Sequence, residues 1–188
     1  MDSVQYCCSY DSPLGAMTMT GDGVSLTGLW FDGQKYFPVS RVAACERRLL
    51  PVFDQTRRWL DLYFSGGNPG TMPFVRLEGS PFRLAVWRLL QEIPRGRVVS
   101  YGAIVRRLSF LRGGARVSAQ AVGGAVGHNP VSIVVPCHRV VGSDGSLIGY
   151  AGGLDRKVAL LRLEGIACRD FSCIASPVEW PGPGGEWL

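Results

Sequence analysis

A glycine- and proline-rich stretch, SGGNPGTMPF at residues 65–74, divides the chain into two parts with different hydrophobic patterns. Such a composition interrupts helices and strands and is typical of a linker between compact units. The total length of 188 residues allows one domain or two small ones. We therefore expect a first domain at 1–76, a second domain at 77–170 and a C-terminal extension at 171–188, which has no periodicity and should lie on the surface.

The first part has the pattern of antiparallel strands followed by a helix. Apolar segments at 4–10, 15–20 and 23–31 are separated by the turn sequences SPLG and GDG. Apolar residues then recur at helical spacing within 42–64, where Pro51 marks either a break or a first turn. This order predicts a small α/β domain with an antiparallel sheet.

The second part has the pattern of short helices. Helices are expected to begin after Ser80, after Ser100 and at about Ser118, because a serine side chain can cap the free N–H groups of a first turn. Pro130 ends the third of them. Two short helices joined by a loop favour a helix-turn-helix. We therefore expect a mainly helical, winged-helix-like second domain.

The third of these helices contains an unusual glycine pair, Gly123-Gly124. Each glycine costs a helix of order 1 kcal/mol relative to alanine. A cost of this size indicates close approach of another structure. Packing against a second helix is favoured over approach of a backbone.

Basic residues are concentrated in one third of the chain. Residues 81–140 contain nine basic side chains and one acidic one, whereas the formal net charge of the whole chain is only +5. All nine are arginine, which suits planar, bidentate contact with phosphate. A solvated face that aids solubility is the alternative. We favour a surface that binds a polyanion, most plausibly nucleic acid.

The chain shows no sign of a disulfide framework, a metal site or a membrane span. Six cysteines occur without a signal peptide, so reduced thiols are expected. The only histidines are His128 and His138, and no C-x-x-C pair exists, so we expect no metal. No apolar run approaches the length needed to cross a bilayer, which predicts a soluble, unsecreted protein.

The stretch VSIVVPCHRVVGSDG contains the candidate nucleophile. A buried, strand-like run at 133–135 is expected to end at Pro136, immediately before Cys137. A thiolate is the reactive form of cysteine, and a neighbouring cation or base increases its population. His138 and Arg139 supply both kinds of neighbour, and Glu164 is the best candidate to orient the imidazole. We expect the other five cysteines to be small buried hydrophobic residues.

The same stretch closely resembles the O6-alkylguanine-DNA alkyltransferases. The resemblance rests on PCHRV at 136–140, the preceding AVGGAVG and NP, and the following GYAGGL at 149–154. It extends over about residues 81–165, whereas the first domain matches only in its strand pattern and SPLG turn. The resemblance implies DNA repair by direct reversal, in which a flipped O6-alkylguanine, and also O4-alkylthymine, transfers its alkyl group irreversibly onto cysteine.

The resemblance also assigns roles to individual residues. It implies that Cys137 is the nucleophile, that His138 and Glu164 form a water-linked relay, that Tyr101 crowds the phosphate and helps protonate guanine, and that Asn129 braces the turn. The base pocket would be formed by Val140, Tyr150, Ala151 and Gly152. No cofactor is implied, and each molecule should act once, as a monomer. The expected location is the cytoplasm, on the nucleoid in a prokaryote, or the nucleus in a eukaryote.

The family presents its helix-turn-helix to the minor groove of double-stranded DNA. An arginine of the family fills the space left by the flipped base, but Gln120 stands at that position here. Gln can hydrogen-bond to an orphaned base, although it carries no charge, and Arg116 is the alternative candidate for this space. The implied contacts with DNA come from Ser100, Arg116, Ala119, Gln120, Ala121 and Gly123. Ala151 stands where some members have serine, which removes one possible hydrogen bond to guanine O6.

Two other classes of function fit part of the sequence. A lesion sensor would bind damaged DNA without repairing it, but the presence of Cys137 argues against this. A thiol hydrolase could use the same cysteine, histidine and glutamate with many turnovers. Hydrolysis does not call for an arginine-rich segment, so this class ranks last.

Overall fold

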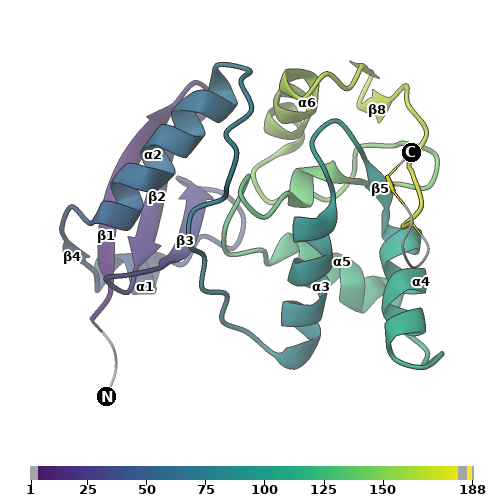
Figure 1. The fold of residues 1–188 in the computed structure, drawn as a ribbon, viewed down its shortest axis with the longest axis horizontal. Coiled ribbons are helices and arrows are strands. Elements are labelled where there is room, and N and C mark those ends of the chain that lie inside the picture. Colours follow the sequence, from purple (N-terminus) through teal and green to yellow (C-terminus); the bar gives the residue numbers. More distant parts are fainter. Residues whose placement is uncertain (1–3, 182–185, 188) are drawn as a thin grey trace. The chain divides into compact units, whose positions relative to one another are not determined.

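The computed structural model describes residues 4–181 and 186–187, which fall into two compact units (Figure 1). The first unit contains residues up to Glu78 together with Pro130–Val134. The second contains Gly79–Asn129 and the chain from Val135 onward. The sequence pattern did not predict that residues 130–134 belong with the first unit.

The first unit is built on a four-stranded sheet with the order β3-β2-β1-β4. The strands β1 (Tyr6–Ser12), β2 (Gly15–Gly21) and β3 (Leu26–Phe31) form two antiparallel pairs, as the alternating pattern predicts. A short strand β4 (Glu46–Arg47) pairs parallel with β1. The sheet is therefore mixed, and the expectation of a purely antiparallel sheet is wrong at this edge.

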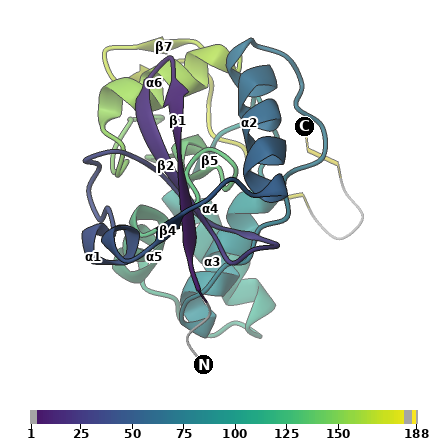
Figure 2. The same cartoon turned by 90° about the vertical axis from the view of Figure 1, so that its left-hand side faces the viewer.

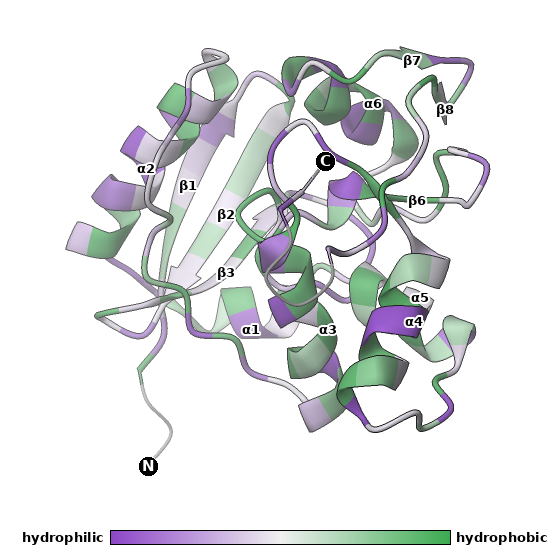
Figure 3. Ribbon diagram, turned by 45° about the vertical axis from the view of Figure 1, so that its right-hand side comes forward, coloured by the Kyte–Doolittle hydropathy of each residue, from purple (hydrophilic) through white to green (hydrophobic). Residues whose placement is uncertain are grey.

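One helix packs against this sheet. After the short helix α1 (Val39–Ala43), the helix α2 (Pro51–Phe64) contacts β1, β2 and β3 (Figure 2). Pro51 is its first residue, where a missing N–H costs nothing. Hydrophilic and hydrophobic stretches alternate along α2 in Figure 3, as expected for a helix with one buried face.

Residues 130–134 bind to the edge of β3. The Leu29 N–H donates to the Pro130 carbonyl at 2.9 Å, and the Ser132 N–H donates to the Leu29 carbonyl at 2.8 Å. Ile133 then adopts a positive φ of 70°, which is strained for a β-branched residue. The strand-like run expected at 133–135 is therefore a tight turn, because buried apolar residues alone do not distinguish the two.

Three helices form the body of the second unit: α3 (Pro81–Glu92), α4 (Tyr101–Leu111) and α5 (Ala119–Gly127). Each has the predicted serine at its N-cap, and each serine hydroxyl accepts a hydrogen bond from the backbone N–H three residues later. These helix starts are confirmed. The helix α4 runs three residues beyond the expected end, which shortens the loop before α5.

Short elements complete the second unit around the PCHRV run at 136–140. The strands β5 (Val99–Ser100) and β6 (Val140–Val141) pair parallel, and the 3-10 turn η1 (Cys137–Arg139) directly precedes β6. The last helix, α6 (Leu154–Leu163), packs against η1. This packing brings the end of the helix, near Glu164, to the turn that contains Cys137.

The chain after α6 forms more regular structure than its sequence indicates. The strands β7 (Cys168–Arg169) and β8 (Ser172–Cys173) form a hairpin, and Val178 N–H donates to the Val98 carbonyl at 2.8 Å. Both cysteines of the hairpin are buried in an apolar cluster of the second unit. Burial of these side chains gives the described part of the extension a defined position. The expected surface location applies only to its exposed residues.

The helices and the possible metal ligands of the described residues form no further site. None of the helices there is long and apolar enough to cross a membrane. No group of three or more histidine, cysteine or acidic side chains in residues 4–181 and 186–187 is placed to hold a metal ion.

Candidate functional site

Cys137 lies in a turn whose geometry is fixed by Asn129. The Cys137 N–H donates to the Val135 carbonyl at 2.8 Å, which closes a tight turn at Pro136. The Asn129 side-chain amide donates to the same Val135 carbonyl at 2.7 Å and to the Cys137 Sγ at 3.0 Å. One amide group therefore holds both the backbone before the cysteine and its sulfur.

A buried cluster of His138, Arg139 and Glu164 lies beside this turn. The His138 Nε2 and Glu164 Oε1 are 2.8 Å apart. Arg139 donates to both carboxylate oxygens of Glu164, at 2.8 and 2.9 Å, and to the Ile93 carbonyl at 2.5 Å. Since a carboxylate only accepts hydrogen bonds, the imidazole proton lies on Nε2, and Nδ1 keeps its lone pair.

The charges in this cluster follow from its burial. Burial lowers the pKa of His138, and the neighbouring Glu164 only partly opposes that effect, so the imidazole is neutral at pH 7. Burial alone would raise the pKa of Glu164. The contacts with His138 and Arg139 outweigh it and hold that pKa well below its usual range. At neutral pH a neutral imidazole is therefore paired with an ionised carboxylate.

The thiol itself is not ionised in the resting protein. Burial raises the pKa of Cys137, although the Asn129 hydrogen bond and the charge of Lys157 oppose this. Arg139, expected as the activating cation, is instead occupied by Glu164. A desolvated sulfur favours its neutral form, and the cation that opposes this effect is Lys157, not Arg139.

Lys157 is a functional candidate that sequence reasoning missed. It is fully buried on α6, and its Nζ donates to the carbonyls of Val140 at 2.5 Å and Ile148 at 2.7 Å. Burial lowers its pKa to about 8, which leaves the ammonium charged at neutral pH. A signal was available: it is one of two lysines in an arginine-rich chain and shares a helical face with Leu160 and Glu164.

Tyr101 connects the start of α4 to the loop before α6. Its hydroxyl donates to the carbonyls of Gly149 at 3.1 Å and Ile148 at 3.3 Å, and burial raises the pKa of the phenol. Gly149 has a φ of 62°, and a Cβ there would lie 2.8 Å from the Tyr101 hydroxyl oxygen. Only glycine satisfies both conditions without strain.

The residues predicted to form the base pocket come from this loop and from β6. Val140 and Tyr150 are buried, Ala151 is half-buried, and Gly152 is buried with its carbonyl accepting from Arg156 at 3.0 Å. The structure therefore gathers Cys137 and its predicted partners within the second unit. Their contact with a base stays a prediction.

Four of the six residues predicted to contact DNA lie on α5, and the other two, Ser100 and Arg116, lie outside it. Ala119, Gln120 and Ala121 are exposed in the first turn, whereas Val122 and Val126 are buried on the opposite face. Arg116 is exposed in the loop before the helix. Ser100 is buried and its hydroxyl caps α4, so the structure shows a structural use for that side chain and leaves its predicted contact with DNA untested.

The glycine pair of α5 does not serve packing within the protein. A Cβ added to Gly123 or Gly124 would meet no atom within 4 Å. The favoured explanation, close packing of a second helix, is therefore wrong. The pair lies on the exposed side of α5, so the helix has an open surface without side chains beside Gln120.

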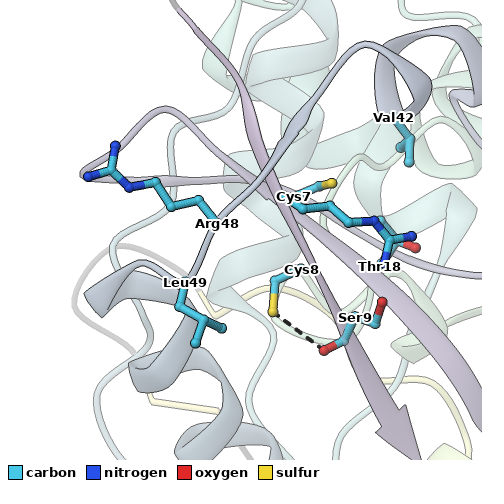
Figure 4. Close-up of a pocket in the computed structure, with 8 residues that line it drawn as sticks. Cys7, Cys8, Ser9, Thr18, Val42, Arg48 and Leu49 are labelled. Carbon is cyan, nitrogen blue, oxygen red and sulfur yellow. Dashed lines mark hydrogen bonds between the residues drawn. The ribbon is translucent and has the colours of Figure 1, made fainter.

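A separate pocket of about 270 Å³ lies in the first unit (Figure 4). It is lined in part by Cys7, Cys8 and Arg48, and the Arg57 guanidinium donates to the Cys8 Sγ at 2.6 Å. Figure 4 shows the Cys8 sulfur directed toward the Ser9 carbonyl. No histidine or carboxylate lines this pocket, so it lacks the base found beside Cys137.

Comparisons with known proteins identify the family of this chain. Residues 5–69 match the family model described as 6-O-methylguanine DNA methyltransferase, ribonuclease-like domain, and residues 81–166 match the DNA binding domain of the same family. A protein of Mycolicibacterium paratuberculosis named methylated-DNA–protein-cysteine methyltransferase is 46% identical over 82% of this chain and 88% of its own length. A Haemophilus influenzae protein of the same name is 37% identical over 86% of this chain and 87% of its own.

Solved structures give the same result. The crystal structure of the Mycobacterium tuberculosis O6-methylguanine methyltransferase is similar with a TM-score of 0.74 and 40% identity, covering 86% of this chain and 93% of that one. The fold and the buried cysteine site together define a cysteine-dependent, DNA-binding transferase. The chain belongs to the 6-O-methylguanine DNA methyltransferase family.

Proposed function

We propose that this protein repairs DNA by direct reversal, by moving the alkyl group of O6-alkylguanine onto the sulfur of Cys137. One observation above all supports this: the Cys137 Sγ accepts a hydrogen bond from Asn129 next to a buried, neutral His138 held by Glu164. The Cys137 sulfur is a soft nucleophile, and the neutral His138 imidazole can act as its base. This combination suits attack on a saturated carbon.

The reaction balances without a cofactor. The sulfur forms a bond to the alkyl carbon while the bond from that carbon to guanine O6 breaks and its electron pair passes to the base. The thiol proton leaves toward His138 Nδ1 through a water molecule, and the departing guanine takes up a proton with Tyr101 as its donor. The His138 imidazolium then gives up the proton it received and Tyr101 takes one up, by exchange through water, so the net transfer is from thiol to guanine. The product thioether is stable, and each molecule acts once.

The raised pKa of Cys137 suits this single use. A neutral, buried thiol reacts slowly with alkylating agents in solution, because the thiolate is the nucleophile. The sulfur is therefore preserved until a base enters the site. Lys157 then stabilises the negative charge that develops on sulfur as the proton leaves.

We also propose that α5 enters the minor groove of double-stranded DNA, with Gln120 at the gap left by the flipped base. The glycine pair gives room for the sugar-phosphate backbone, since nothing in the protein occupies that space. A structure of the M. tuberculosis protein in complex with DNA, 38% identical to this chain, supports DNA as the partner. All side chains that this mechanism uses come from one chain, which supports action as a monomer. The proposed location of the protein is the compartment that contains chromosomal DNA.

Intact-mass measurement tests the proposed reaction. After incubation with duplex DNA containing O6-methylguanine, the protein should gain one methyl group, and peptide mapping should place it on Cys137. Cys137→Ala should gain none while keeping its affinity for DNA, and Cys8→Ser should react like the wild type. Unchanged mass with DNA bound would instead support the lesion sensor. Repeated turnover on an ester or amide would support the hydrolase.

Gly124→Ala should have opposite effects on stability and on DNA binding. The new methyl group meets open space, so the helix gains roughly 0.5 to 1 kcal/mol of stability from alanine's higher propensity. The same methyl group should weaken DNA binding at least several-fold, because it occupies the proposed path of the backbone. Urea unfolding and fluorescence anisotropy with a labelled duplex measure the two effects. An unchanged affinity would exclude α5 as the contact surface.

Gln120→Ala and Arg116→Ala distinguish the two candidates for the gap left by the flipped base. Loss of the gap-filling side chain should slow transfer from duplex DNA about tenfold and leave transfer from free O6-benzylguanine unchanged, because the free base needs no flipping. Loss of a phosphate contact should instead reduce the slope of log affinity against log salt by about 0.9. We expect the first result for Gln120 and the second for Arg116. If Arg116→Ala slowed transfer from duplex DNA and Gln120→Ala reduced the salt slope, Arg116 would be the side chain that fills the gap.

A further inference from the structure

The hairpin after α6 contains two cysteines directly opposite each other. Cys168 and Cys173 are register partners in β7 and β8, and their sulfur atoms are 3.7 Å apart. The Ile174 N–H donates to the Ala167 carbonyl at 2.9 Å, which makes the cysteines a non-hydrogen-bonded pair, where opposing side chains are closest. Two sulfurs in this arrangement need little movement to form a disulfide.

The turn of this hairpin is tight and strained. Asp170 and Phe171 have φ values of 47° and 56°, as the two central residues of a type I′ turn require. Aspartate tolerates this conformation, whereas a phenylalanine at position 171 adopts it at a cost. The burial of both cysteines, with Ile166 and Leu161 in the same cluster, offsets that cost.

The hairpin supports the loop that leads into the candidate site. The Leu147 N–H donates to the Phe171 carbonyl at 2.7 Å, and the Cys173 N–H donates to the Gly145 carbonyl at 2.9 Å. The contact with Gly145 is close: its φ is 81°, and a Cβ there would lie 2.8 Å from the Cys173 oxygen. The next residue after Leu147 is Ile148, whose carbonyl accepts from Lys157.

We propose that Cys168 and Cys173 form a redox-active dithiol, and that its oxidation to a disulfide locks the hairpin beneath residues 145–149. The pair lies within the second unit, beyond the residues that the family's DNA binding domain covers, which end at 166. The role of residues 145–149 in alkyl transfer rests on the proposed function. The disulfide and its effect on this loop are independent of the proposed function.

The oxidant is a small-molecule disulfide. One protein thiolate attacks it, a mixed disulfide forms and one small thiol is released. The second cysteine then displaces the other small thiol, so the protein pair is oxidised, the small disulfide is reduced, and both thiol protons end on the released thiols. Burial raises the pKa of Cys173 to about 12, so this exchange is slower than at the half-exposed Cys8, which serves as an internal reference.

Oxidised glutathione tests the pair in the full-length protein. After incubation for hours and quenching of free thiols, peptide mapping should find a crosslink between Cys168 and Cys173, with the loss of two hydrogen atoms. Cys168→Ser and Cys173→Ser should not form it, whereas Cys8→Ser should form it normally. Glutathione on Cys8 with both hairpin cysteines still reduced, or held as separate mixed disulfides, would overturn the proposal.

Hydrogen exchange tests the effect on the loop. Amides of residues 145–149 should exchange several-fold more slowly in the oxidised protein, and the melting temperature should rise by roughly 5 °C, because the crosslink restricts local and global opening. Both changes should reverse on reduction and be absent in Cys173→Ser. A crosslink that leaves exchange at these amides unchanged would overturn the locking role. Neither readout uses DNA or Cys137, so a failure here is distinct from a failure of alkyl transfer.

Discussion

Glu164→Gln should lower the free energy of unfolding by about 3 kcal/mol, because removing one partner of a buried ion pair leaves the other charge uncompensated. Arg139 would lose both of its short contacts with a carboxylate. The glutamine can also present its NH₂ group to His138, which removes the preference for a proton on Nε2. We therefore expect single-turnover alkyl transfer to fall at least 100-fold, well beyond what the lost stability alone would cause.

The stability difference should depend on pH in a defined direction. The pKa of Glu164 is depressed in the folded protein, so its contribution is fully present above the ordinary carboxyl range, begins to decline below about pH 4.5 and is lost as pH falls through the folded-state pKa. Urea unfolding of wild type and variant at a series of pH values measures this. The two curves should converge in acid.

Glu179→Gln is the matched control. Glu179 pairs with Arg106, but both side chains are more than 60% exposed, so this ion pair should contribute less than about 1 kcal/mol. We expect normal transfer by this variant. Equal losses for the two substitutions would mean that the buried cluster has no special role. A stable Glu164→Gln protein with normal transfer would exclude the proposed relay.

Lys157→Met should reduce the rate of alkyl transfer at pH 7 by roughly 10- to 100-fold, because the variant lacks the cation that favours the Cys137 thiolate. Methionine has a similar length and fills the same space without charge. The Val140 and Ile148 carbonyls would each lose a donor, which should also loosen the loop that leads to Tyr150.

The pH profile separates the charge of Lys157 from its structural role. Burial lowers the pKa of Lys157 to about 8 and raises the pKa of Cys137, so the wild-type rate should rise with thiol ionisation up to about pH 8 and level off above it, because loss of the ammonium charge then cancels the further gain in thiolate. The rate of the variant should continue to rise above pH 8. Single-turnover kinetics with a methylated duplex from pH 6 to about pH 9.5 provides the measurement. Levelling at the same pH in Lys157→Met would assign it to another group.

Local sequence signals were sufficient for most of the second unit. The serines at positions 80, 100 and 118 cap their helices as predicted, since capping depends on the side chain and the first turn alone. Local signals were insufficient where apolar residues run together. The segment 133–135 was expected to be a strand, but hydrogen bonds to β3 turn the chain before it and leave Ile133 with a positive φ.

The candidate site shows the same division. Cys137, His138 and Glu164 were identifiable as candidates from residue type and from a resemblance to the family, and the structure buries all three, with His138 bound to Glu164. The ionisation state of the Cys137 thiol was not identifiable from the sequence, because it depends on burial and on which cation is nearest to the sulfur. Arg139 is adjacent in sequence but is held by Glu164, whereas Lys157 is twenty residues away in sequence and acts on the sulfur.

The sequence by itself determined the family, the order of the elements and the candidate for the reactive residue, because these are encoded in local patterns and in a specific motif. Only the tertiary structure decided the charges at the site, the open space beside the glycine pair and the pairing of Cys168 with Cys173. Each of these depends on which groups remote in the chain come within a few ångströms of one another, and on how much water they exclude.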